Sequence, residues 1–140
     1  MTDLEISFDL ARLDFQATSD LLKGTYWGGQ RTDEINRRAF ENSLCAIALI
    51  DNKQVGFARA SGDRAVYMRI SDVIVWPEHR GKGIGKALVE ALLSHPDLSS
   101  VSTWMLNTSD AHGLYARYGF KPTDGNEMRL DRPASATGQS

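Results

Sequence analysis

A glycine-rich turn between a strand pattern and a helix pattern is the feature that most limits how this chain folds. An apolar run ends at Pro77, and residues 80–86 then read Arg-Gly-Lys-Gly-Ile-Gly-Lys. From Ile84, near the end of this turn, apolar residues recur at the spacing of one helix face: Ile84, Ala87, Leu88, Ala91 and Leu92. The chain is therefore expected to pass from a strand through a tight loop into a helix within a few residues.

The start of this predicted helix is suited to an anion. The first turn of a helix leaves backbone N–H groups without partners, and the helix dipole adds partial positive charge there. Glycines at positions 81, 83 and 85 let a phosphate approach the backbone because they have no Cβ. The same segment adds full positive charges on Arg80, Lys82 and Lys86. Such a turn can also be only a tight connection, but glycines and cations together favour an anion site.

The spacing of the glycines distinguishes between kinds of phosphate loop. A Walker A loop needs Ser or Thr after Gly-Lys, but Gly85-Lys86 is followed by Ala87, so a nucleoside triphosphatase is not indicated. The dinucleotide fingerprint needs its third glycine one residue later than Gly85. The pattern that does fit residues 80–85 is Arg-x-x-Gly-x-Gly.

This segment closely resembles the pyrophosphate loop of the GNAT superfamily of N-acetyltransferases, which bind acetyl-coenzyme A (acetyl-CoA). The likeness rests on Arg-x-x-Gly-x-Gly at residues 80–85 and on Val75-x-Pro77 before it. It implies acetyl-CoA as co-substrate, with no metal ion. It also implies that the loop contacts the coenzyme through Arg80, Gly81, Lys82, Gly83, Ile84, Gly85 and Lys86.

Length and composition are those of one soluble globular domain. The chain has 140 residues, of which 41% are hydrophobic and 24% charged. We expect one domain over residues 1–132 and a disordered tail of small and polar residues over 133–140. A net charge of −2 argues against binding nucleic acid through overall charge. The single cysteine, Cys45, excludes a disulfide framework and a cysteine metal cluster.

The sequence predicts a cytoplasmic protein without membrane contacts. Its acidic start, residues 1–5, lacks the apolar segment of a signal peptide. The longest apolar run, Leu44 to Ile50, is too short to cross a bilayer.

Hydrophobic periodicity predicts an α/β fold with a mixed sheet. The short turns between residues 44 and 76 predict an antiparallel meander, and the helix that follows is a crossover to a parallel strand. The GNAT acyltransferase fold has this order of elements, so the resemblance covers nearly the whole chain. Strands are expected at 4–10, 44–50, 55–60, 65–76, 101–106 and 127–130, and helices at 14–24, 33–42, 83–94 and from Ser109 or Asp110 onward.

Strand 65–76 contains a carboxylate that its alternation would bury. Met68 and Ile70 are apolar on one face, and unbroken alternation places Asp72 with them. Either the carboxylate is buried or the period slips, and a β-bulge near Asp72 is the simpler explanation. In the GNAT fold the equivalent strand has a bulge and parts from its parallel neighbour in a V-shaped splay. The resemblance implies that backbone groups at this point contact the pantetheine arm of the coenzyme, namely those of Val73, Ile74 and Val75.

Acetyl transfer from a thioester to an amine needs a base for the amine, a donor for the carbonyl oxygen and an acid for the thiolate. The resemblance assigns the carbonyl donor to a backbone N–H near Val73. It assigns the acid to Tyr115, because residues 114–120 resemble the GNAT segment Leu-Tyr-x-x-x-Gly-Phe, whose tyrosine commonly faces the coenzyme sulfur. A phenol keeps its proton at neutral pH and can donate it. The alternative is that Tyr115 belongs to an apolar helix stripe and packs in the core.

Two further positions have both a functional and a structural interpretation. Asn107 ends a strand where GNAT proteins often place a polar residue on the pantetheine, but it can equally be a turn residue. Asp72 can be the general base if burial raises its pKa, or a structural hydrogen-bond acceptor for loop amides. His112 and water are the other candidates for the base.

Acceptor specificity is expected between the first two helices. Tyr26 and Trp27 lie beside Gly28-Gly29 and resemble an aromatic wall on a loop, although Trp27 can instead fix a helix end to the core. The predicted function is acetyl transfer from acetyl-CoA to a primary amine of a small molecule, by direct attack in a ternary complex. The alternative is a non-catalytic coenzyme A sensor or interaction module of the same fold. GNAT proteins often pair, so the resemblance is compatible with a homodimer.

Overall fold

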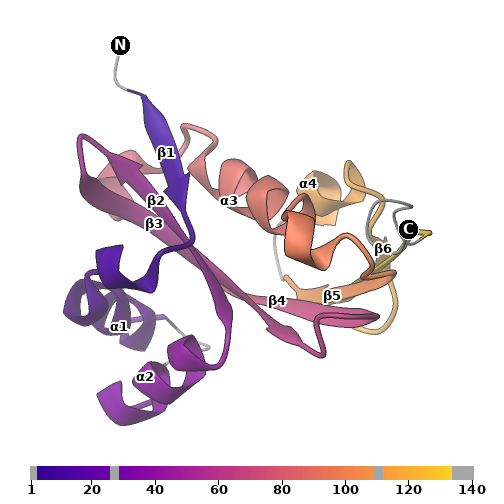
Figure 1. The fold of residues 1–140 in the computed structure, drawn as a ribbon, viewed down its shortest axis with the longest axis horizontal. Helices are drawn as coiled ribbons and strands as arrows, with labels where there is room; N and C mark the ends of the chain where they lie inside the picture. The colour runs from indigo at the N-terminus through magenta and orange to yellow at the C-terminus, as the bar shows by residue number, and fades with distance from the viewer. Residues whose placement is uncertain (1–2, 26–28, 109–111, 134–140) are drawn as a thin grey trace. The chain divides into compact units, whose positions relative to one another are not determined.

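The chain folds as an α/β protein, and the computed structural model describes residues 3–25, 29–108 and 112–133 (Figure 1). The strands are β1 (Leu4–Ser7), β2 (Leu44–Ile50), β3 (Lys53–Gly62), β4 (Tyr67–Val75), β5 (Thr103–Asn107), β6 (Lys121–Pro122) and β7 (Glu127–Asp131). The α-helices are α1 (Phe15–Lys23), α2 (Asp33–Glu41), α3 (Ile84–Leu93) and α4 (His112–Ala116). Short 3-10 helices are η1 (Leu10–Arg12), η2 (Pro77–His79) and η3 (Pro96–Leu98).

Over the described residues, the strands form a seven-stranded mixed sheet in the order β1-β2-β3-β4-β5-β7-β6. β1 is antiparallel to β2, and β5 is antiparallel to β7. β4 and β5 are parallel, with residues 67–69 beside residues 103–105. The mixed sheet and the parallel pair confirm the predicted fold class and the predicted crossover through α3.

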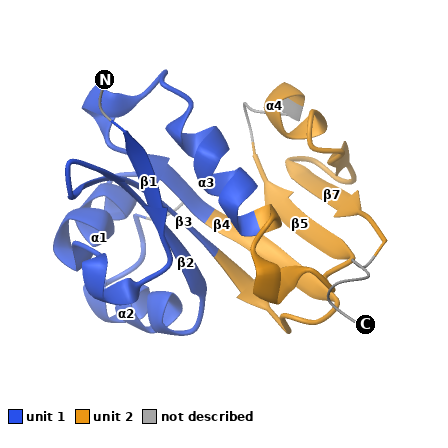
Figure 2. Cartoon of the chain, turned by 45° about the horizontal axis from the view of Figure 1, so that its top comes forward, with its two compact units in different colours: residues 1–59, 72–92 blue, residues 60–71, 93–140 orange. Residues whose placement is uncertain are grey.

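The chain divides into two compact units (Figure 2). Unit 1 consists of residues 1–59 and 72–92, and unit 2 of residues 60–71 and 93–140. The divisions fall inside β3, β4 and α3, so these elements contribute to both units. The glycine-rich loop and Asp72 belong to unit 1, whereas Asn107 and Tyr115 belong to unit 2.

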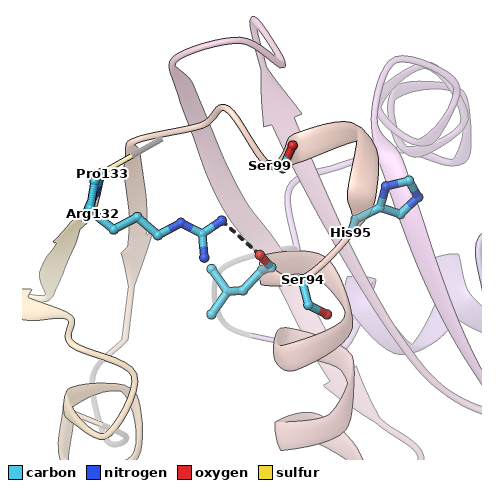
Figure 3. A pocket seen from close by; sticks show the side chains of 6 residues that line it. Ser94, His95, Ser99, Arg132 and Pro133 are labelled. Atoms are coloured by element: carbon cyan, nitrogen blue, oxygen red, sulfur yellow. Dashed lines mark hydrogen bonds between the residues drawn. The ribbon is translucent and has the colours of Figure 1, made fainter. Parts of the chain in front are cut away.

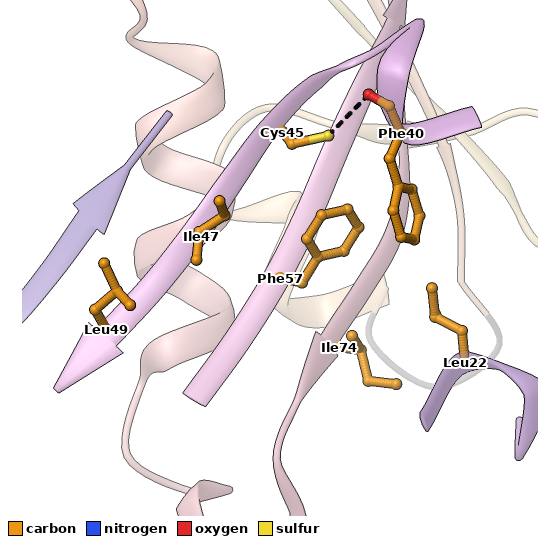
Figure 4. Close-up of a cluster of buried hydrophobic side chains, with 7 residues drawn as sticks. All are labelled: Leu22, Phe40, Cys45, Ile47, Leu49, Phe57 and Ile74. Atoms are coloured by element: carbon orange, nitrogen blue, oxygen red, sulfur yellow. Dashed lines mark hydrogen bonds between the residues drawn. The ribbon is translucent and has the colours of Figure 1, made fainter. Parts of the chain in front are cut away.

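A cluster of buried apolar side chains holds α1 and α2 on the strands of unit 1 (Figure 4). The ring centroid of Phe40, on α2, lies 4.7 Å from that of Phe57 on β3 and 5.7 Å from that of Phe15 on α1. These contacts remove apolar surface from water and so stabilise both helices on this face. The cluster consists of Leu22, Phe40, Cys45, Ile47, Leu49, Phe57 and Ile74.

α3 packs on the opposite face of the same strands. A Cβ at Gly56, on β3, would lie 3.1 Å from Cγ2 of Ile84 and 3.2 Å from Cδ1 of Leu88, so glycine permits this close approach. Gly56 and its neighbour Phe57 face opposite sides because side chains alternate along a strand. Unit 1 therefore has three layers, with α1 and α2 on one side of its strands and α3 on the other.

Local sequence explains where several elements begin and end. β2 and β3 are joined by Asp51 and Asn52, whose φ angles are 53° and 65°, the geometry of a two-residue hairpin turn. This confirms the turn predicted there. The Thr32 hydroxyl accepts a hydrogen bond from the N–H of Ile35 at 3.2 Å and caps α2, so the preceding Arg31 is set at the start of that helix.

Unit 2 is built around β5 and β7. Trp104 of β5 and Met128 of β7 are fully buried. β6, which periodicity did not predict, adds Lys121 and Pro122 to the edge of β7. Within the described part of the chain, no helix is both long and apolar enough to cross a membrane.

Candidate active site

The glycine loop at the start of α3 has the backbone that an anion site requires. Gly81 and Gly83 both have φ of +80°, a left-handed conformation that residues with a Cβ rarely adopt. At either glycine, apart from the glycine and its two neighbours in the chain, no described atom lies within 4 Å of the position a Cβ would occupy. The glycines are therefore required by backbone conformation, and the space beside them is open to a ligand.

The cations of this loop are available to an anion. Arg80, Lys82 and Lys86 are exposed. Nε of Arg80 donates to the carbonyl oxygen of Val75 at 3.1 Å, which ties the loop to the end of β4. Among the described residues, none of the three cations forms an ion pair with a carboxylate. Within the described structure, their charge is thus available to an anion around the first turn of α3.

The end of β4 lies against the same turn. A Cβ at Gly85 would lie 3.7 Å from Cγ2 of Val75 and 3.9 Å from Cγ1 of Val73. Ile74, between them, is buried on the other face in the cluster under α1 and α2. Of the three β4 residues expected to contact the coenzyme, Val73 and Val75 therefore lie next to the start of α3.

Asp72, just before this segment, is held by two arginines. Its Oδ1 accepts from Nη2 of Arg31 at 2.8 Å, and its Oδ2 accepts from Nη1 of Arg31 at 3.0 Å. Nε of Arg59 donates to Oδ2 at 2.7 Å, and Nη1 of Arg59 donates to the Ser43 hydroxyl at 3.1 Å. Both carboxylate oxygens are therefore engaged by guanidinium groups.

The backbone at Asp72 departs from a regular strand while its side chain stays inside. Ile70, Asp72 and Ile74 are all buried and the residues between them are half-buried, so the alternation of burial continues through Asp72. A buried carboxylate, and not a slipped period, is therefore what the structure has. The φ of Asp72 is 55°, in the left-handed region. This is a local distortion at the position where the bulge was predicted.

The ionisation of Asp72 follows from these contacts. Burial raises the pKa of the carboxyl, but hydrogen bonds and charge from Arg31 and Arg59 outweigh it, so the pKa lies below its ordinary 3.8. A general base works best with a pKa near the operating pH and with a free oxygen. Of the two interpretations of Asp72, the geometry favours the structural one, with arginine side chains as its donors in place of loop amides.

Sequence reasoning missed Arg31 and Arg59. Arg31 lies on the segment before α2, and Arg59 lies on β3, both far from Asp72 along the chain. A signal was present: a carboxylate at a buried strand position needs a cation, and Arg59 is the charged residue in an otherwise apolar stretch, residues 55–60.

Tyr115 lies on α4 and is buried, with 8% of its surface exposed. Its ring packs edge-on against Phe120, with centroids 6.1 Å apart. Tyr118 is only half-buried, so Tyr115 has the stronger packing role of the two. Asn107, the last residue of β5, is exposed and lies opposite Glu127 of β7.

Some predicted residues lie outside the described structure. Tyr26 and Trp27 fall in residues 26–28, and most of the predicted tail falls in 134–140. His112 begins α4, but its side chain is not described.

A pocket in unit 2 is lined by none of the residues that the sequence predicted for the active site (Figure 3). Its volume is about 310 Å³, and Nη2 of Arg132 at its wall donates to the carbonyl oxygen of Leu93 at 2.9 Å. A cation on the last carbonyl of α3 stabilises the helix end, which explains Arg132 without a ligand. The described residues include no group of three or more His, Cys, Asp or Glu side chains that could hold a metal ion. The pocket is lined by Leu93, Ser94, His95, Ser99, Arg132 and Pro133.

Comparison with known proteins agrees with the geometry of the glycine loop. The family model for the acetyltransferase (GNAT) domain matches residues 41–122, which include this loop and Asp72. A crystal structure from Xanthomonas campestris pv. campestris, of a protein assigned to the GNAT family, is 43% identical, with a TM-score of 0.83. The match covers 88% of this chain and 87% of that protein.

Two other matches extend the comparison. The uncharacterised N-acetyltransferase ycf52 of Pyropia yezoensis is 35% identical over 94 residues, which cover 62% of this chain and 54% of the relative. This chain thus spans about half the length of that curated relative. A GNAT-family acetyltransferase from Elizabethkingia anophelis, solved with acetyl-CoA bound, is 15% identical with a TM-score of 0.71, covering 92% of this chain and 98% of that one. At this identity the likeness is one of fold.

Proposed function

The chain belongs to the GNAT family of acetyltransferases, and from this premise we propose that it transfers the acetyl group of acetyl-CoA to a primary amine of a small molecule. The amine attacks directly in a ternary complex. In this proposal residues 1–132 act as one catalytic domain in the cytoplasm. The observation that carries the proposal is the open, positively charged glycine loop at the start of α3.

The loop holds the coenzyme diphosphate through the backbone N–H groups of residues 81–86. This role is supported by left-handed glycines with free space beside them and by cations that have no carboxylate partner among the described residues. Arg80, Lys82 and Lys86 neutralise the phosphate charge. The acetyl-CoA bound to the Elizabethkingia anophelis protein, which shares this fold, is consistent with the same co-substrate here.

The remaining residues divide the chemistry among them. The backbone N–H near Val73 donates to the carbonyl oxygen as negative charge develops on it, and backbone groups of Ile74 and Val75 contact the pantetheine. Tyr115 donates a proton to the departing thiolate, and Asn107 contacts the pantetheine. Tyr26 and Trp27 form part of the acceptor wall.

The base is assigned to water or to His112. Asp72 is less suited, because both of its oxygens accept from guanidinium groups and its pKa is lowered. The role proposed for Asp72 is to order the segment of β4 that leads to Val73.

Replacing Tyr115 with Phe tests the acid. We expect turnover to fall by about a hundredfold or more, because loss of a general acid costs roughly two to four orders of magnitude. Coenzyme A affinity is expected to stay within about twofold, since the ring still packs on Phe120. The measurements are thiol release from acetyl-CoA over a panel of amines, and calorimetric titration with coenzyme A.

Tyr118→Phe is the matched control, because it removes a hydroxyl from a half-buried tyrosine of the same segment. Equal losses in the two variants would argue against Tyr115 as the acid. Coenzyme A binding without thiol release for any amine would instead favour the alternative function, a non-catalytic coenzyme A sensor.

A further inference from the structure

The cluster of Arg31, Asp72 and Arg59 carries one more positive than negative charge. Arginine is always protonated in proteins, and the pKa of Asp72 lies below its ordinary value, so the carboxylate is ionised at neutral pH. The Asp72 side chain is 4% exposed, that of Arg31 20% and that of Arg59 15%. The surplus charge is thus largely withdrawn from water yet still reachable, which favours an anionic ligand.

The two guanidiniums also have donors that the cluster does not use. Each guanidinium has five N–H donors. Arg31 uses two of them on Asp72, and Arg59 uses one on Asp72 and one on Ser43. Nε of Arg31 is buried and has no acceptor among the described residues, so it is closed to a ligand in this structure, and the donors left for a ligand are the remaining N–H groups of the Nη atoms.

The cluster lies on the face of unit 1 that is opposite α3. Asp72 and Ile74 share one face of β4, and Ile74 packs in the same apolar cluster as Phe40 of α2. Val73 and Val75 point to the other face, where Gly85 lies in the first turn of α3. The cluster therefore does not compete with the glycine loop for the diphosphate, and it lies one residue from the proposed carbonyl donor, the N–H near Val73.

We propose that Arg31 and Arg59 bind a carboxylate of the acceptor, so that the acceptor is an amine that also carries a carboxylate, as an amino acid does. The inference rests on the proposed function and narrows its substrate class. One surplus positive charge matches one carboxylate, and the Nη donors that Asp72 and Ser43 leave unused can hydrogen-bond to it. Polyamines and aminoglycosides are disfavoured, because their cationic groups are repelled by the same charge.

Matched acceptors test this directly. Thiol release from acetyl-CoA is measured for a panel of amino acids and for the corresponding amino acid amides, which keep the amine and side chain but lose the carboxylate. The amide's amine loses its proton more easily, so reactivity alone favours the amide. We expect kcat/KM to be at least about tenfold higher for the preferred amino acid than for its amide, the size typical of a charged hydrogen-bonded contact.

Variants of Arg31 test whether its side chain contacts the acceptor carboxylate. Arg31→Gln is expected to raise KM for the amino acid by about tenfold more than it raises KM for the amide. Arg31→Lys keeps the charge and is expected to recover part of the loss. Arg38→Gln, on the exposed surface of α2, removes the same charge and is the control expected to change neither. Melting temperatures of the variants show whether each remains folded.

The outcomes separate this inference from the function on which it rests. A preference for the amino acid that Arg31→Gln abolishes supports the inference. The inference is overturned if amino acid amides are turned over as fast as the amino acids. It is also overturned if Arg31→Gln raises KM equally for the amino acid and its amide. Either result leaves the acetyltransferase proposal intact. If none of the amines tested gives thiol release from acetyl-CoA, the proposed function is overturned, and this inference with it.

Discussion

At the scale of single residues, Asp72 combines an unusual backbone with a buried charge. A left-handed φ of 55° in a strand is costly for a residue with a Cβ, although aspartate tolerates it better than most. Its ion pairs with Arg31 and Arg59 offset that cost and fix the carboxylate between β3 and the start of α2. Such local strain, maintained by strong contacts, is characteristic of positions that shape a functional site.

Replacing Asp72 with Asn tests how much this cluster contributes to stability. The variant leaves two partly buried guanidiniums without a counter-charge, so we expect the free energy of unfolding at pH 7 to fall by about 3 kcal/mol. Urea unfolding measures the change. Asp131→Asn, which breaks an exposed pair with Arg129, is the control and is expected to cost much less.

The same variant gives a pH dependence with a definite sign. Since the pKa of Asp72 is lower in the folded chain than its ordinary 3.8, its stabilising contribution is complete above about pH 5. That contribution is lost as the pH falls through the folded value. The difference in unfolding free energy between the wild type and Asp72→Asn should therefore be constant near neutrality and shrink in acid. A difference that persists undiminished at pH 2 would contradict the assignment.

At the scale of elements, the passage from β4 through the glycine loop into α3 is the most constrained segment. A strand, a left-handed turn and an apolar helix face follow each other in the sequence, so this segment could be predicted from local pattern alone. β6 could not, because Lys121–Pro122 is too short to show periodicity and contains a proline. The Asp51-Asn52 turn could be predicted although it is short, because Asp and Asn are residue types that suit positive φ.

Gly83→Ala tests this segment. Alanine at φ of +80° is strained by about 1–2 kcal/mol, and its Cβ would occupy space that the account gives to the diphosphate. We expect lower stability and at least about tenfold weaker coenzyme A binding in calorimetric titration, the effect of losing roughly one good phosphate contact. Gly125→Ala, at φ of +58° with equal free space, should lose stability but keep coenzyme affinity. If both variants bind coenzyme A as the wild type does, the loop does not hold it.

At the scale of the whole molecule, the fold was more predictable than the site. Apart from β6 and the short 3-10 helices, the order of the elements along the chain follows from hydrophobic periodicity, and the parallel pairing of β4 with β5 follows from the helix that connects them. The Arg31–Asp72–Arg59 cluster was not predicted, because it joins residues 41 and 13 positions apart, which no local pattern connects. The buried position of Asp72 required a partner, but alternation along one strand does not name it. The proposed roles of Tyr115 and Asn107 still rest on the family resemblance.

The central claim is that the backbone at the start of α3 holds the diphosphate of acetyl-CoA. A crystal structure of the protein with acetyl-CoA tests it most directly. We expect phosphate oxygens at hydrogen-bond distance, about 3 Å, from backbone nitrogens of residues 81–86, with Arg80, Lys82 and Lys86 around them. Coenzyme density anywhere else on the protein, with residues 81–86 unoccupied, would contradict it.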